Sequence, residues 1–322
     1  MRTIPLGKSG LTVSRVAFGT WQLGGDWGPT DEKSAIAAIR RAADSGVTFF
    51  DTAQAYGFGA SERLLAQALR GRTREELVIA TKGGLRPEGS GVVRDASATS
   101  IEKGVIESLQ ALDTDYIDLY QVHWPDPDTP VEETAGTLAK LVADGTIRHV
   151  GVSNFDAKQM EAFSAFLPVE TLQPPYHLFR REIEETALPY AATHDIGVLV
   201  YGPLAHGLLG GHLRPDTRFA PGDWRASSAV FHGATYERNL QVVADLERFA
   251  RGELGITLGQ LAVAWTLANP AVHVAIVGTR NPDHVDEALA AAEIDFGEDA
   301  MRRIGEIMRP ATPIAGPRPE TV

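Results

Sequence analysis

A carboxylate, a phenol, an amine and an imidazole stand at or just beyond the ends of three apolar segments. Asp51 follows one apolar run, and Tyr56 stands five residues later in the loop beyond it. Lys82 and His123 end two further apolar runs. A phenol, with a pKa near ~10, is a poor proton donor at neutral pH unless something stabilises its anion. A lysine held by a carboxylate can supply that cation, so these residue types point to proton-transfer chemistry.

Composition excludes several classes of function. The chain has 322 residues, of which 43% are hydrophobic and 22% charged, as in ordinary globular proteins. A net charge of −12 argues against a nucleic-acid partner. No apolar run approaches the ~20 residues that span a bilayer, and residues 1–7 lack an apolar signal segment, so we expect a cytoplasmic protein without a membrane partner. The absence of cysteine excludes disulfides, thiolate metal sites and cysteine nucleophiles.

Strands and helices alternate along the whole chain. A hairpin is predicted over residues 3–14, a long loop over 202–234 and a loosely held tail over 309–322. The predicted strands are 13–19, 47–50, 77–82, 116–123, 148–152, 169–173, 198–201 and 273–277. The predicted helices are 31–45, 61–69, 96–112, 130–145, 157–166, 182–194, 236–251, 258–268, 282–292 and 298–308.

Eight such alternations fit either a closed (β/α)8 barrel or a doubly wound open sheet. Polar residues recur at the ends of the strands, and in a barrel these ends converge on one mouth. No linker divides the chain. We therefore predict an α/β fold, a (β/α)8 TIM barrel forming one domain over 1–322, with an N-terminal β-hairpin and two extra C-terminal helices. The polar strand-end residues are Asp51, Lys82, His123, Asn154, Gln173, Tyr201 and Arg280.

A glycine-containing loop at residues 57–62 follows a strand and opens a helix, as a Rossmann phosphate loop does. Its third glycine position is occupied by Glu62, whose carboxylate would oppose a pyrophosphate. The loop also begins several residues too late, so the Rossmann interpretation is disfavoured.

The arrangement of Asp51, Tyr56, Lys82 and His123 resembles the catalytic tetrad of the aldo-keto reductases. The resemblance covers essentially the whole chain and is greatest for a bacterial branch with His-Trp-Pro-Asp after strand four. It implies a barrel, a nicotinamide cofactor bound in an extended form without a Rossmann domain, and carbonyl reduction. The matching blocks are residues 6–14, 18–21, 51–57, 151–155 and 278–280.

The resemblance implies a role for each member of the tetrad. Tyr56 would protonate the carbonyl oxygen as hydride reaches the carbon. Lys82 would lower the pKa of the phenol, and Asp51 would hold and ionise Lys82. His123 would hydrogen-bond the substrate oxygen. Taken singly, a surface tyrosine, an ordinary ion pair and a backbone-bonded histidine are the alternatives.

The resemblance also implies a cofactor site. Ser153, Asn154 and Gln173 suit the nicotinamide carboxamide, which needs both donors and acceptors, and Tyr201 would stack on the ring. Other expected cofactor contacts are Thr20, Trp21, Gly202, Leu204, Gly207, Leu209, Gly210, Gly278 and Thr279; in the loop after Tyr201, glycines would let backbone N–H groups approach the pyrophosphate.

Arg280 is the expected ligand of the adenosine 2′-phosphate, which favours NADPH over NADH. Two residues depart from the family pattern: His284 stands where Arg or Gln is frequent, and Ala288 where Asn is frequent. Glu287 could still hold the adenine amino group. These departures bear on cofactor preference rather than on catalysis.

Aromatic residues are expected to line the substrate pocket: Trp21, Trp27 and Trp124, with Trp224 as a further candidate. For Trp27 and Trp224, simple packing is an equal alternative. No metal site is expected, because no His-x-His pair or other ligand cluster has suitable spacing.

The sequence thus predicts an NADPH-dependent reductase of aldehydes or ketones, acting as a monomer or weak homo-oligomer on a small-molecule carbonyl substrate. The alternative is a cofactor-binding regulatory subunit with slow turnover, like the barrel subunits attached to ion channels. The physiological substrate depends on long loops and is not specified by these motifs.

Overall fold

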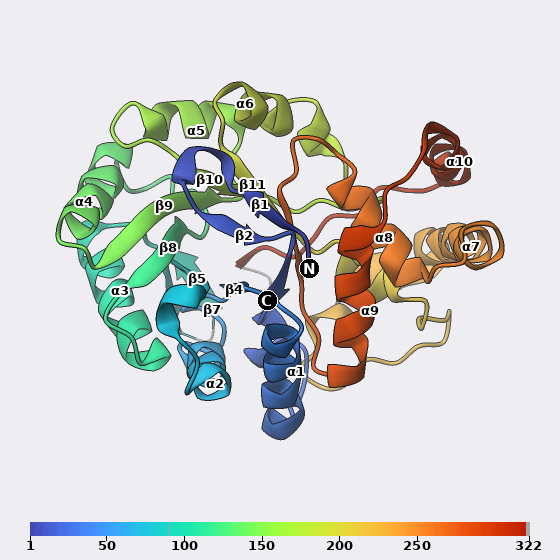
Figure 1. The fold of residues 1–322 in the computed structure, drawn as a ribbon, viewed down its shortest axis with the longest axis horizontal. Coiled ribbons are helices and arrows are strands. Elements are labelled where there is room, and N and C mark those ends of the chain that lie inside the picture. The colour runs from blue at the N-terminus through green and yellow to red at the C-terminus, as the bar shows by residue number, and fades with distance from the viewer. Residues whose placement is uncertain (90, 320–322) are drawn as a thin grey trace.

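The computed structural model describes residues 1–89 and 91–319 and shows a closed barrel of eight parallel strands (Figure 1). This confirms the predicted (β/α)8 fold. Each barrel strand pairs with the next barrel strand along the chain, and the last pairs with the first. In order around the barrel the strands are β3 (Val16–Gly19), β4 (Phe49–Asp51), β5 (Val78–Gly83), β8 (Ile117–Val122), β9 (Ile147–Ser153), β10 (Thr171–Gln173), β11 (Gly197–Tyr201) and β12 (Val274–Val277).

An antiparallel hairpin closes one end of the barrel. Its strands, β1 (Thr3–Pro5) and β2 (Thr12–Ser14), lie within the predicted range. Leu6 and Val13 are fully buried and belong to the apolar cluster inside the barrel. Leu6 also approaches Gly197 at the start of β11, where a Cβ atom would lie only 2.7 Å from the leucine Cγ. The hairpin therefore seals the N-terminal end of the strands and leaves the opposite mouth for chemistry.

Helices surround the barrel (Figure 1), and none in the described ranges is long and apolar enough to cross a bilayer. Two further helices, α7 (Gly233–Phe249) and α10 (Glu298–Met308), pack against each other on the outside. The helices next to the strands are α1 (Glu32–Asp44), α2 (Ala60–Leu69), α3 (Ala98–Leu112), α4 (Val131–Ala143), α5 (Ala157–Ser164), α6 (Ala187–Thr193), α8 (Leu258–Leu267) and α9 (Val285–Ala290).

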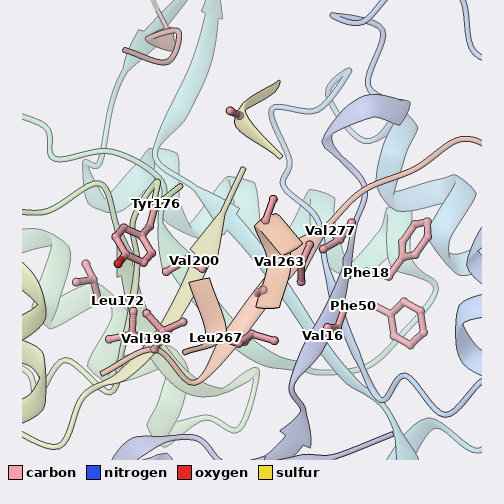
Figure 2. Close-up of a cluster of buried hydrophobic side chains, with 14 of the residues drawn as sticks. Val16, Phe18, Phe50, Leu172, Tyr176, Val198, Val200, Val263, Leu267 and Val277 are labelled. Atoms are coloured by element: carbon pink, nitrogen blue, oxygen red, sulfur yellow. The ribbon is translucent and has the colours of Figure 1, made fainter. Parts of the chain in front are cut away.

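The larger apolar core lies between the strands and the helices. Figure 2 shows Phe18 and Phe50 from neighbouring strands, with Val263 and Leu267 projecting from α8 towards the barrel wall. Helix α8 begins where it was predicted, because Thr257 caps it: the Thr257 hydroxyl accepts the backbone N–H of Gln260, while the Gln260 side chain accepts the backbone N–H of Thr257. Outward-facing strand residues thus fix the helices, and inward-facing residues remain for the site.

Two internal regions differ from the prediction. A second hairpin, β6 (Leu85–Glu88) with β7 (Gly91–Arg94), follows β5, where no element was predicted. The helix predicted over 182–194 is a short turn followed by α6, because Pro189 fits only the first turn of a helix: its ring would clash with the preceding turn of a longer one.

The described part of the C-terminal tail is packed rather than loose. Asn239 donates from Nδ2 to the Thr312 carbonyl at 3.0 Å and accepts the Thr312 N–H at 2.9 Å. The backbone N–H of Ile314 donates to the Phe179 carbonyl at 3.0 Å, and the Ile314 side chain is buried. These contacts direct the tail back over the barrel, while residues 320–322 lie outside the described residues.

Candidate active site

The alternation of side chains along each strand brings the predicted residues to one mouth. Phe49 and Ala80 lie in the cluster inside the barrel, and side chains two residues further along a strand face the same way. Asp51 and Lys82 are those residues, and the same alternation brings His123 inward just beyond β8. The ends of three neighbouring strands therefore present their polar side chains to a common space.

The four predicted catalytic side chains meet there. Lys82 Nζ donates to Asp51 Oδ2 at 2.7 Å, to the Thr52 carbonyl at 2.8 Å and to the Tyr56 hydroxyl at 3.4 Å. The Lys82 and Asp51 side chains are only 1% and 4% exposed. The rings of Tyr56 and His123 lie edge to face with centroids 5.7 Å apart. The site thus holds a buried ion pair in direct contact with a phenol, beside an imidazole.

Burial determines the protonation states of this cluster. It raises the pKa of Tyr56 well above its ordinary value, with the Asp51 charge adding to the shift. It lowers the pKa of Lys82, against the opposing effect of Asp51, and lowers that of His123 well below its ordinary value. The expected lowering of the Tyr56 pKa by Lys82 is therefore outweighed by burial. The phenol keeps its proton and the imidazole is neutral.

A hydrogen-bond network extends from the tetrad to β9, β10 and β11. Gln173 donates from Nε2 to Asp51 Oδ1 at 2.7 Å, and Ser153 Oγ donates to the Gln173 carbonyl at 2.9 Å. Asn154, whose backbone is left-handed with φ of +64°, donates to the His123 carbonyl at 3.0 Å. The Tyr201 hydroxyl donates to Asn154 Oδ1 at 2.9 Å. The amide groups predicted to bind nicotinamide are thereby held in fixed orientations.

Three adjoining cavities form one groove that starts at the tetrad. Neighbouring cavities share lining residues: Tyr56 and Tyr201 between the first and second, and Leu204, Gly207 and Gly278 between the second and third. The first cavity has a volume of about 220 Å³, and its lining includes Trp21, His123, Trp124, Ser153, Asn154 and Gln173. Gly202 lines the second cavity. The third cavity has a volume of about 610 Å³, and its lining includes Gly210, Thr279, Arg280, His284 and Glu287.

Arg280 is fixed at the far end of this groove. Its Nη1 donates to the carbonyls of Trp27 at 3.1 Å and of Pro29 at 3.0 Å. Nearby, Glu287 Oε1 accepts the Thr257 hydroxyl at 2.5 Å, while the ring of His284 stacks over that of His212. A cation therefore lies at the end of the groove remote from the tetrad.

Four predicted or candidate contacts take other positions, among them Trp224, which stacks on Trp21 and is absent from the lining of the three cavities. Leu209 is fully buried in the outer core and Thr20 is fully buried behind Asp51, whose backbone carbonyl accepts the Thr20 hydroxyl at 3.1 Å. Neither lines the groove. Trp27 lines the second and third cavities rather than the first, and packs edge to face on Trp21. These residues support the walls instead of facing the first cavity.

Several residues of the first cavity escaped sequence reasoning. Asp26, Leu85 and Val92 line it, together with residues 317–319 of the tail. They come from a loop, an unpredicted hairpin and the C-terminus, and no periodic pattern marks them. Gln121, whose Oε1 lies 3.4 Å from Gln173 Nε2, could have been found, because it precedes His123 by two residues and so shares its face.

A barrel with this buried tetrad and groove has the architecture expected of a cofactor-dependent barrel oxidoreductase. The profile of the Aldo/keto reductase family matches residues 15–309. The chain belongs to that family. Membership supports an oxidoreductase that uses a nicotinamide cofactor.

Curated relatives extend over most of the chain. Aldo-keto reductase YhdN of Bacillus subtilis is 42% identical and covers 89% of this chain and 87% of its own length. NADH-specific methylglyoxal reductase of Escherichia coli is 34% identical, and the match covers 96% of this chain and 99% of that protein. A probable voltage-gated potassium channel subunit beta of Arabidopsis thaliana is 35% identical, covering 90% of each.

Solved structures show the same fold. Glycerol dehydrogenase AKR11B4 from Gluconobacter oxydans superposes with a TM-score of 0.88 at 37% identity, covering 98% of this chain and 97% of its own. An aldo-keto reductase from Klebsiella pneumoniae, solved in complex with NADPH, has a TM-score of 0.75 at 29% identity, and the match covers 100% of this chain and 99% of that one.

Proposed function

We propose that this chain is an NADPH-dependent reductase of aldehydes and ketones, with Tyr56 as the general acid. One observation carries the proposal. Lys82 Nζ lies 3.4 Å from the Tyr56 hydroxyl at the inner end of a groove that leads to Arg280. A proton donor, a buried cation beside it and a channel with a terminal guanidinium are the parts that this reaction needs.

The tetrad would act through a small number of contacts. Tyr56 lines the first cavity with His123, and its hydroxyl would donate a proton to the carbonyl oxygen as negative charge develops there. The resulting phenolate is stabilised by the ammonium of Lys82, which Asp51 keeps in place at 2.7 Å. Neutral His123 supplies one N–H donor that can orient the same oxygen.

The groove suits an extended dinucleotide, which when bound supplies the hydride. Ser153, Asn154 and Gln173 would hold the carboxamide, and Tyr201 would lie against the nicotinamide ring. Glycine-rich backbone at Gly202 and beyond borders the middle of the groove, where the pyrophosphate would lie. The preference for NADPH rests on Arg280, since the relatives include an NADH-specific enzyme as well as a structure with NADPH bound.

Replacement of Tyr56 by phenylalanine tests the proposed acid. NADPH absorbance is followed with an activated aromatic aldehyde, and cofactor affinity is measured separately by fluorescence titration. We expect kcat to fall by about 10²- to 10⁴-fold while NADPH affinity is retained, because only the proton donor is lost. Equal activity of wild type and Tyr56→Phe would exclude Tyr56 as the acid.

A regulatory role is the second candidate, because a probable potassium channel subunit beta is 35% identical over 90% of the chain. Such a protein would bind the cofactor in the same groove and turn over slowly. The same assay separates the two functions. A wild type that binds NADPH tightly but is as inert as Tyr56→Phe towards all aldehydes offered would favour the regulatory role.

A further inference from the structure

We infer that Asp26 selects the substrates of this enzyme: it excludes carbonyl compounds that carry a carboxylate or phosphate and favours neutral ones with a hydroxyl group. The inference rests on the proposed carbonyl reduction and concerns the substrate class. Asp26 lines the first cavity together with Tyr56 and His123. Among the described residues that line this cavity, it is the one with a carboxylate.

The position of Asp26 is fixed by its neighbours in space. Its backbone carbonyl accepts the N–H of Trp224 at 3.0 Å, and the next residue, Trp27, forms a bridge with Asp223. The loop before α1 is thereby tied to the long loop after β11. The Asp26 carboxylate therefore belongs to an organised wall of the cavity.

The surroundings of this carboxylate are aromatic and partly dry. Asp26 is partly buried, and burial raises its pKa, against a hydrogen bond with Trp21. Trp21 in turn stacks on Trp224, with ring centroids 6.1 Å apart and planes at 16°. A carboxylate offers about four lone-pair positions, so one indole donor leaves it able to accept a hydroxyl of a substrate.

No equally buried cation faces Asp26 across the first cavity among the described residues that line it. Arg318 also lines the cavity, but it is an exposed residue, so water screens its charge. Lys82 lies deeper and is neutralised by Asp51 at 2.7 Å. A negatively charged substituent entering the cavity would thus meet a like charge in partly dry surroundings.

The size of the repulsion between Asp26 and an anionic substituent follows from the short distances within a small cavity. Two like charges several ångströms apart in partly buried surroundings repel enough to change affinity by about tenfold or more. A substrate hydroxyl has the opposite effect, since it donates to a carboxylate whose hydrogen-bond donor among the described residues is Trp21 alone. The charge of a substrate should therefore affect its kcat/KM more than its size does.

Rigid aldehydes of similar shape provide the test. Benzaldehydes substituted at position 3 or 4 with carboxylate, methyl ester or hydroxymethyl are compared in wild type and Asp26→Asn, a substitution that keeps shape and removes charge. We expect wild type to prefer the ester over the carboxylate by about tenfold or more in kcat/KM, and Asp26→Asn to reduce that ratio by a similar factor. Asp26→Leu should additionally lose any preference for hydroxymethyl over unsubstituted benzaldehyde.

The ratio separates this inference from the proposed function. Asp26 also raises the pKa of Tyr56, so its replacement can change the rate with every aldehyde, but such a change cancels in the ratio. An ester-to-carboxylate ratio that is the same in both proteins would overturn the inference even if reduction proceeds. If no aldehyde is reduced, the proposed carbonyl reduction is refuted. The preference for ester over carboxylate is then measured as a ratio of binding affinities, by quenching of tryptophan fluorescence. Thermal melting of each variant confirms that it is folded.

Discussion

Replacing Asp51 by asparagine should destabilise the protein in a manner that depends on pH. The substitution leaves Lys82, 1% exposed, without the carboxylate that now lies 2.7 Å away. An unpaired buried ion costs about 3–5 kcal/mol. The amine can escape this cost by losing its proton, which at pH 7 requires at most about 4.6 kcal/mol from a usual pKa near ~10.4. We therefore expect a loss of about 3–4.6 kcal/mol at pH 7.

The sign of the pH dependence follows from the lysine. Burial already lowers the pKa of Lys82, and loss of Asp51 lowers it further, so the folded variant binds fewer protons than the unfolded chain below pH ~10.4. Its stability should then rise with pH, and the deficit relative to wild type should shrink to at most about 1.9 kcal/mol at pH 9. Urea unfolding followed by tryptophan fluorescence at both pH values measures this difference.

Lys82→Met provides a matched control with the opposite expectation. It leaves Asp51 buried without its cation, and a carboxylate can neutralise itself only by binding a proton, so its deficit should grow as pH rises. The double variant should recover much of the stability of both singles, because a neutral amide and a methionine require no counter-ion. Equal deficits of Asp51→Asn at pH 7 and pH 9 would refute the reasoning, since Lys82 would then keep its proton unaided.

Three other substitutions probe the groove, the tail and the loop. Arg280→Leu should raise the KM for NADPH by about ten- to hundredfold with little change for NADH, and equal effects in steady-state assays would contradict a 2′-phosphate contact. Asn239→Ala removes both hydrogen-bond partners of the Thr312 backbone, so it should lower the free energy of unfolding in urea by about 1–3 kcal/mol and raise the KM for aldehydes. An unchanged KM would show that the position of the tail does not affect substrate binding. Burial lowers the pKa of His206 to about 3, so this side chain binds fewer protons in the folded than in the unfolded chain below pH ~6.5 and contributes about 2 kcal/mol to the stability lost between pH 7 and pH 5, beside similar contributions from the buried His123 and His177. His206→Gln should lack that contribution, and matching pH slopes in urea unfolding would contradict it.

The end of the candidate site that holds the four predicted catalytic side chains was predictable because two simple regularities determine it. A parallel barrel collects the ends of its strands at one mouth, and the two-residue period of a strand fixes which side chains point inward. Asp51, Lys82 and His123 satisfy both, so their convergence follows from counting along each strand. Tyr56 lies beyond a strand end, and its contact with Lys82 depends on the turn after β4.

The walls of the cavities were not predictable in the same way. Asp26, Val92 and Pro317 meet at one cavity although they are far apart in the sequence and lie in segments without periodicity. Leu209 shows the converse, because a glycine-rich loop suggests a phosphate contact without indicating which side chains turn inward. Here backbone at Gly207 and Gly210 lines the groove, while Leu209 packs into the core.

The charge of the buried tetrad limits how the reaction can proceed. Asp51 and Lys82 cancel each other, while burial keeps Tyr56 protonated and His123 neutral, so the cluster carries no net charge before proton transfer. In the proposed reduction, the cluster would carry one negative charge after proton donation by Tyr56, in surroundings that disfavour charge. Lys82, 3.4 Å from that oxygen, is the nearest compensation among the contacts of the hydroxyl in the described chain. Removal of the Lys82 charge should therefore slow proton donation by Tyr56 even where the fold is preserved, as in the double variant.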